Sequence, residues 1–254
     1  MSAQALEVAK TSPTSRSTPV LKAQTPYKPP VPPNLGAPKG RVLGGASRGI
    51  CSHYQSMQAL LPSGDRKTPW AFTALAHPTL WFYLPEQKLE NTKLEFVLQD
   101  PADQYIYKTV LASSKPTGGV ISLSLPANGP ALIPGLMYTW TLSIPCNPSR
   151  PGQVAFVQGT LVRAAWPSIA SSEAGSDSLT TTQALAEKGF WFDAVTLAAK
   201  GYQHQPTNSA LANLWQSLLG KTGVAKLDLL PPTTGYYANN TQTVLTTEAT
   251  ALSP

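Results

Sequence analysis

The sequence predicts a mainly β protein: an immunoglobulin-like antiparallel β-sandwich followed by a small tetratricopeptide-like helical segment. Between residues 70 and 164, short runs of alternating apolar and polar residues are separated by turn sequences such as DPAD and PANGP, a pattern typical of half-buried antiparallel strands. After residue 182, the apolar residues recur with helical spacing instead.

Seven strands are predicted in the sandwich. In one clear run, Tyr138 and Trp140 share one face of the strand, while Thr139 and Thr141 share the other, so we expect the aromatic face in the core. The predicted strands cover residues 70–75, 80–84, 93–99, 104–112, 119–125, 137–144 and 153–164. About seven short strands at this spacing are typical of an immunoglobulin-like sandwich.

Three helices are expected within residues 183–226, in TQALAEKG, FWFDAVTLAAKGYQ and NSALANLWQSLLGKTG. Glycine at the end of the first and third helices suits a C′ position, which favours positive φ. Gly223 follows Gly189 by 34 residues, the period of a tetratricopeptide repeat, and Ala194 and Pro206 add to the repeat-like pattern. Because such a short array is not self-sufficient, the segment must cap the sandwich or extend a partner's array.

The remaining segments are expected to be connectors and tails. Residues 1–39 contain eight prolines, which remove backbone donors and predict a disordered, semi-extended tail. Residues 40–165 form the sandwich domain with its Gly-rich first segment, residues 166–182 a polar connector, and residues 227–254 a second disordered tail.

Composition argues against several classes of protein. Only 13% of the residues are charged, about half the usual ~25%, which favours an exported or envelope protein. The net charge is +6, but the first 40 residues alone hold five Lys or Arg and one Glu. The folded part therefore offers no clustered basic surface for nucleic acid. No apolar run approaches the ~18 residues of a transmembrane segment, and no secretory leader is visible.

The stretch GRVLGGASRGIC, residues 40–51, is the most distinctive glycine cluster. It lacks the Lys-Ser/Thr of a phosphate-binding loop. Cys51 and His53 show no third member of a catalytic triad. We expect instead that Cys51 pairs with Cys146, the other cysteine of the chain, if the compartment is oxidising.

Six blocks in order, RVLGGASRGIC, PTLWFYLP, LEFVLQD, GVISLSLP, YTWTLSIPCNPSRP and EKGFWFDAVTLAA, resemble the cyanobacterial family catalogued as domain of unknown function 928. The family's Gly-Gly-x-x-Arg-Gly-x-Cys block is matched by Gly44, Gly45, Arg48, Gly49 and Cys51, and its second cysteine by Cys146. Its Gly-aromatic-Trp-aromatic-Asp-Ala block is matched by residues 189–194. The resemblance covers residues 40–223 and implies exported proteins without an established activity.

Three classes of function follow from these observations. The first is a non-enzymatic adaptor of the envelope or secreted fraction that binds another envelope protein. Its candidate partner surface is Trp191, Phe192, Asp193 and Trp215, since large aromatic residues often anchor interfaces, although each of the four also suits a core.

The second class is a carbohydrate-binding module, with a polysaccharide as the partner. This class would be favoured if at least two of four aromatic residues, Trp81, Tyr83, Tyr105 and Tyr107, lay coplanar on one open face. The third class is an enzyme. We expect neither this class nor a cofactor, because the acidic residues Glu86, Glu95, Asp100 and Asp103 fall at strand ends and turns, and no metal-ligand spacing is present.

Overall fold

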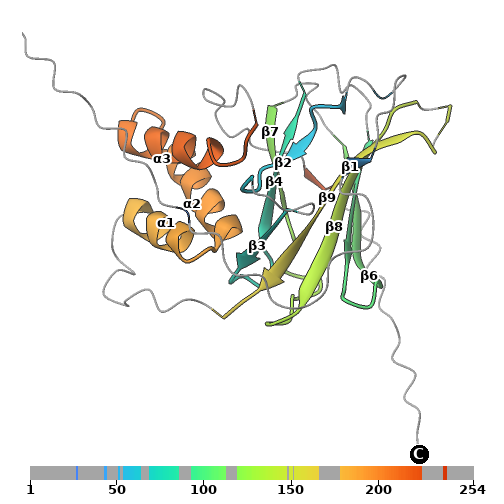
Figure 1. The fold of residues 1–254 in the computed structure, drawn as a ribbon, viewed down its shortest axis with the longest axis horizontal. Coiled ribbons are helices and arrows are strands. Elements are labelled where there is room, and N and C mark those ends of the chain that lie inside the picture. The colour runs from blue at the N-terminus through green and yellow to red at the C-terminus, as the bar shows by residue number, and fades with distance from the viewer. Residues whose placement is uncertain are drawn as a thin grey trace, which may run out of the picture.

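A computed structural model of the chain is mainly β, with two sheets and three helices (Figure 1). It describes residues 27, 43–44, 51, 54–63, 69–85, 93–112, 119–147, 149–150, 152–165, 178–224 and 237–238. The strands are β1 (Leu43–Gly44), β2 (Gln58–Ala59), β3 (Trp70–Thr73), β4 (Thr79–Leu84), β5 (Lys93–Gln99), β6 (Tyr105–Ala112), β7 (Gly119–Ser124), β8 (Met137–Pro145), β9 (Val154–Arg163) and β10 (Tyr237–Ala238). All seven predicted strands are confirmed as β3 to β9, with ends within two residues of the expected ones.

The larger sheet has the strand order β1-β9-β8-β5-β6-β10, and the smaller sheet has the order β2-β4-β7. Neighbouring strands are antiparallel, with one exception among the described pairs: β3 pairs in parallel with β9, Ala71 lying opposite Leu161. The antiparallel expectation is therefore wrong for β3. Alternation of apolar residues reports which face of a strand is buried, but it carries no information about the direction of the neighbouring strand.

The core lies between the two sheets and is built from the residues that the alternation assigns to it. Trp140 of β8 meets Phe82 of β4 edge to face, with ring centroids 5.5 Å apart. Gly159 lies opposite Trp140 in the β8–β9 register, and a Cβ atom at Gly159 would come within 2.9 Å of Cε2 of the indole. The absence of a side chain at this position lets the large ring lie flat over its neighbouring strand.

The three helices are α1 (Ser178–Glu187), α2 (Trp191–His204) and α3 (Ser209–Leu219). Helix α1 begins five residues before the expected start of the helical segment. Its first residues include three threonines, which have low helix propensity, but Thr182 and Leu185 are fully buried and their packing outweighs that preference.

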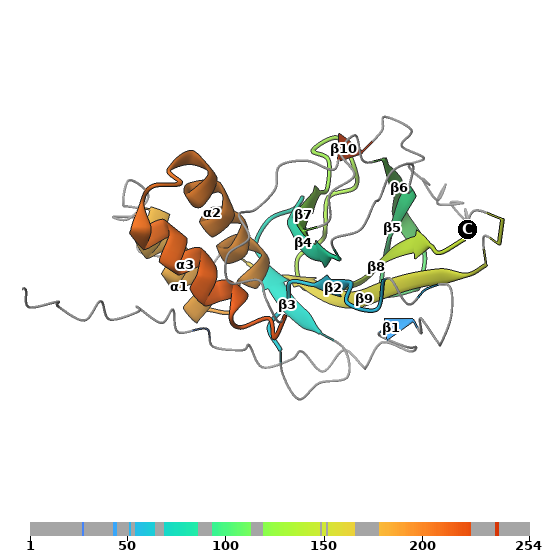
Figure 2. The same ribbon diagram turned by 90° about the horizontal axis from the view of Figure 1, so that it is seen from above.

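Local signals at the helix ends are confirmed. Gly189 after α1 and Gly223 after α3 have φ angles of 82° and 69°, values that glycine adopts without strain. Asn208 caps α3, and its side-chain oxygen accepts hydrogen bonds from the amides of Ala210 and Leu211. In both Figure 1 and Figure 2 the helices lie together at one end of the molecule, next to β3.

Two short pieces of the expected tails have defined positions. Tyr27 packs against the core, and β10 pairs with the edge strand β6, so residues 237–238 form a strand where the sequence predicts disorder. The other residues of the two predicted tails, and residues 166–177 of the connector, lie outside the described residues. Within the described part of the chain, no helix combines the length and apolarity needed to cross a membrane.

Candidate functional site

Several buried polar contacts of the chain lie where the helices meet β3. We call this region the helix–sheet junction and define it as Leu60, β3 with Ala74, and residues 189–196. Strand β3 pairs with β9 along one edge only, so the amides along its other edge need partners. The amide of Phe72 donates to the carbonyl of Gly189 at 3.4 Å. The amide of Ala74 donates to Oδ2 of Asp193 at 2.9 Å. The start of α2 thus replaces a neighbouring strand.

Asp193 links the helix to the sheet through both carboxylate oxygens. The hydroxyl of Thr73 donates to Oδ1 at 3.2 Å, and Asp193 also lies in the first turn of α2, where a negative charge is favoured by the helix dipole. The side chain is nonetheless only 4% exposed.

Burial decides the ionisation of this carboxyl. It raises the pKa of Asp193 from 3.8 to about 6, while the hydrogen bonds from Ala74, Thr73 and its own amide act in the opposite direction. Arg163, which lies opposite Thr73 in the β3–β9 register, uses its guanidinium to donate to the carbonyls of Ala74 and Leu132. Asp193 is therefore a buried carboxyl held by hydrogen bonds.

Trp191 of the junction and Trp81 of β4 are held by hydrogen bonds from their indole N–H groups. Trp191 donates to the carbonyl of Leu60 at 2.7 Å. Trp81 donates to the hydroxyl of Thr196 at 3.0 Å, and this hydroxyl in turn donates to the carbonyl of Phe192. Buried indoles with satisfied donors are rigid elements of packing, so the junction is a preformed surface of contact between helix and sheet.

The four residues predicted as a partner surface are buried at and beside this junction. Trp191, Phe192, Asp193 and Trp215 are 0%, 3%, 4% and 1% exposed, and Trp215 packs edge to face on Trp81 with ring centroids 5.8 Å apart. These four residues join the helices to the sheets and do not form an exposed surface, because the apolar face of a short helical segment is buried on the nearest sheet.

Two parts of the glycine-rich segment, residues 40–51, are among the described residues. Gly44 lies in β1 and pairs with Phe156 of β9, whereas Gly45, Arg48 and Gly49 lie outside the described residues. Cys51 and Cys146 form a disulfide with their Cα atoms 5.1 Å apart. This bond ties the segment that precedes β2 to the residue that follows β8.

The aromatic residues named for a carbohydrate platform are mostly internal. Trp81 and Tyr107 are buried and Tyr83 is half-buried, whereas Tyr105 is 53% exposed. The two buried rings lie in the core rather than on an open face, and the other two belong to different sheets, Tyr83 to the smaller and Tyr105 to the larger.

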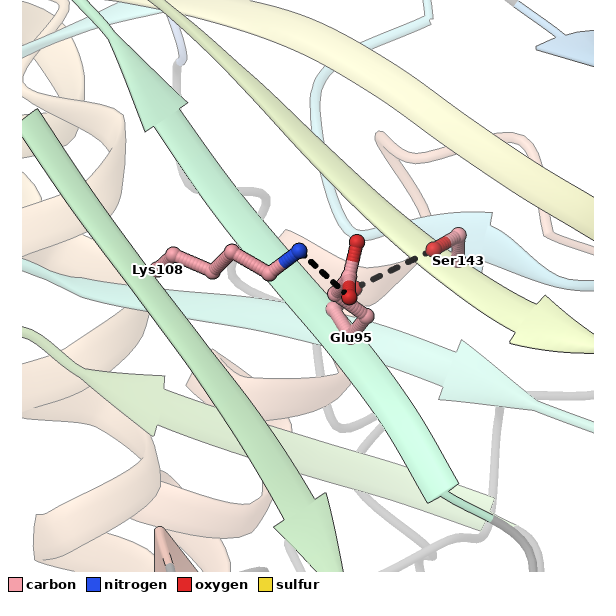
Figure 3. Close-up of polar contacts among 3 residues, drawn as sticks. All are labelled: Glu95, Lys108 and Ser143. Atoms are coloured by element: carbon pink, nitrogen blue, oxygen red, sulfur yellow. Dashed lines mark hydrogen bonds and ion pairs between the residues drawn. The ribbon is translucent and has the colours of Figure 1, made fainter. Parts of the chain in front are cut away.

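Two of the acidic residues that were considered for an enzymatic site and set aside have contacts within the fold. Glu95 forms an ion pair with Lys108 at 2.8 Å (Figure 3). The side chains of Glu95 and Lys108 are 41% and 44% exposed, so the pair lies at the surface. Asp100 accepts hydrogen bonds from the amides of Ala102 and Gln104 and so closes the turn between β5 and β6. Glu86 lies outside the described residues, and the described residues contain no group of three or more His, Cys, Asp or Glu side chains that could hold a metal ion.

Sequence reasoning missed Thr73, Arg163 and the role of the β3 edge. Thr73 and Arg163 stand far from Asp193 in the chain, and no local pattern signals their contacts. Asp193 itself was found through its motif, but the motif did not reveal that its carboxylate binds the end of a strand.

Comparison with known proteins gives one clear result. The model of the family described as Domain of Unknown Function (DUF928) matches residues 43–231, a range that contains β1 to β9, all three helices and both cysteines. No curated protein matches the chain. The match covers more than half of the chain and includes the sheets, the helices and the disulfide, and the chain therefore belongs to the DUF928 family.

Proposed function

We propose that this protein is a non-enzymatic adaptor of the cyanobacterial cell envelope or secreted fraction, which binds another protein through the outer face of its larger sheet. The outer face is formed by the side chains of β6, β5, β8 and β9 that point away from the core. The observation that carries the proposal is that the charged side chains among the described residues of this face are few and include a mutually paired Glu95 and Lys108, and that the helices of the structure lie at the β3 end of the sheet (Figure 2).

The strand registers define the residues of the outer face. Val97 of β5 lies between Lys108 of β6 and Thr141 of β8, and Thr141 lies opposite Gln158 of β9. Gln158 donates through Nε2 to the Thr141 hydroxyl at 3.2 Å. The charged groups among the described residues of this face are Lys93, at the start of β5, and the Glu95–Lys108 pair.

Such a face suits protein recognition for an energetic reason. Isolated charges are costly to desolvate, and interface centres are accordingly poor in charged residues. Side chains that already pair within the face, such as Glu95 with Lys108 (Figure 3), need not lose their partner when another protein covers them.

We also propose that the two sheets form an immunoglobulin-like sandwich, a fold that presents an exposed sheet face of this kind. The order β9-β8-β5-β6 opposite β4-β7 corresponds to the GFCC′ and BE strands of that fold. Tyr138, at the start of β8, accepts a hydrogen bond through its hydroxyl from the amide of Ile133 at 2.8 Å, as expected of a tyrosine corner. The helices would then be a tetratricopeptide-like cap beside the sandwich.

The disulfide supports an exported location. Disulfides persist in oxidising compartments and are rare where thiols are kept reduced. Cys51 is buried, so its bond with Cys146 contributes to the fold of the first segment rather than to an exposed reactive site.

A variant of the outer face tests the adaptor function. Thr141→Arg places an unpaired charge at the centre of the face, and Gln104→Arg places the same charge at an exposed turn as the matched control. We expect cross-linked affinity purification from native envelopes to recover the same protein with the wild type and the control, and to lose it with Thr141→Arg.

Two outcomes would contradict the proposal. Recovery of the same protein with all three baits would show that the outer face is not the binding surface. Recovery of polysaccharide without a protein partner would favour the carbohydrate-binding alternative. Circular dichroism of each bait establishes that the substitution leaves the fold intact.

A further inference from the structure

A tyrosine from the proline-rich first segment packs on the helix–sheet junction. The ring of Tyr27 meets the indole of Trp191 edge to face, with centroids 4.8 Å apart and an angle of 74° between the ring planes. Burial of Tyr27 raises the pKa of its hydroxyl far above the ordinary value. The contact is therefore an aromatic pair between the partly buried Tyr27 and the fully buried Trp191, on segments separated by more than 160 residues.

On the junction side of this contact, hydrogen bonds hold Trp191 in place. The indole of Trp191 is held by its hydrogen bond to the carbonyl of Leu60, and the amide of Leu60 donates to the carbonyl of Trp81 at 2.8 Å. An aromatic surface whose orientation is already fixed loses little conformational entropy when a ligand covers it.

The ligand side of the contact has the chemistry of a docking peptide. Tyr27 stands in the sequence Thr-Pro-Tyr-Lys-Pro-Pro, residues 25–30. Proline fixes φ and carries no amide donor, so such a segment has low conformational entropy before binding and few backbone groups to satisfy. Proline-rich peptides are recognised by aromatic surfaces for these reasons.

The connection between ligand and junction permits exchange between molecules. Fifteen residues, 28–42, separate Tyr27 from β1, a length that spans up to about 50 Å when extended. A linker of this length gives Tyr27 a high local concentration at its own junction. The same contact can form with the tyrosine of another molecule.

We propose that the Trp191 surface is a docking site for the proline-flanked Tyr27 segment, and that the segment of a second copy of this chain occupies it in an exchanged dimer. The Tyr27 contact within one chain is the unimolecular form of the same interaction. This inference is independent of the outer face of the larger sheet, so either proposal can fail without the other.

The test uses the full-length chain with Tyr27→Ala, which empties the docking site, and a synthetic peptide of residues 20–34. Isothermal titration should show binding of this peptide to the Tyr27→Ala chain. We expect binding to be at least about tenfold weaker with a peptide carrying alanine for tyrosine, and at least about tenfold weaker with the wild-type chain, whose site is filled. The Tyr27→Phe chain keeps the ring and should behave as the wild type.

Sedimentation at rising protein concentration tests the exchange itself. The wild type and Tyr27→Phe should form dimers at high concentration, whereas Tyr27→Ala should remain monomeric. A correctly folded Tyr27→Ala chain that does not bind the peptide would overturn the docking site. Equal dimer fractions in the wild type and Tyr27→Ala would overturn the exchange.

Discussion

Replacing Asp193 by asparagine tests whether burial or hydrogen bonding dominates the ionisation of this carboxyl at the helix–sheet junction. Burial raises the pKa of Asp193 from 3.8 to about 6, and a rise of about two pKa units corresponds to about 3 kcal/mol. Because the folded-state pKa is higher than the unfolded-state pKa, folding favours the protonated carboxyl. The stabilisation from this group is complete below about pH 4 and is lost as the pH rises through about 6.

Asparagine keeps the shape of the side chain and cannot ionise. Its oxygen can accept from the Ala74 amide in place of Oδ2, and its amide group can donate to the hydroxyl oxygen of Thr73. Loss of a negative charge from the first turn of α2 costs about 0.3–1 kcal/mol. We therefore expect Asp193→Asn to be about 2 kcal/mol more stable than the wild type at about pH 8, with the advantage disappearing below about pH 4.

Urea unfolding followed by tryptophan fluorescence, run on both proteins across this pH range, measures the difference. Glu95→Gln is the control, since it makes the same chemical change at a half-exposed carboxylate and should alter the unfolding free energy by less than about 1 kcal/mol. If Asp193→Asn were less stable than the wild type at about pH 8 and this difference disappeared below about pH 4, the hydrogen bonds to the ionised carboxylate would outweigh its burial, and the reasoning would be refuted.

Three further substitutions examine the packing and the disulfide. Trp191→Ala should lower the unfolding free energy by about 3–5 kcal/mol, because it opens a cavity and leaves a buried carbonyl unpaired; a wild-type melting temperature would contradict its place in the core. Gly159→Ala should cost about 1–3 kcal/mol in urea unfolding through overlap with the indole on β8, whereas Gly152→Ala, which meets no atom within 4 Å, should be nearly neutral. Cys146→Ser opens a bridge that spans 95 residues and should cost about 4 kcal/mol; equal melting temperatures with and without reductant in the wild type would exclude a stabilising bond.

Most secondary structure of this protein was predictable because its signals are local. The alternation in residues 137–144 reports one buried face, and β8 has that face in the core. The glycines after α1 and α3 have the positive φ angles that their position predicts. These features depend on neighbours two to four residues away, and the sequence by itself determined them.

Only the tertiary structure decided how these elements meet. Periodicity shows that a face is buried but does not name what covers it, so the parallel pairing of β3 with β9 and the contact of Trp191 with Leu60 were beyond sequence reasoning. The carboxylate of Asp193 completes the edge of a strand about 120 residues earlier in the chain. Such contacts arise because every buried backbone amide needs an acceptor, and the acceptor is supplied by whichever segment the fold brings to that edge.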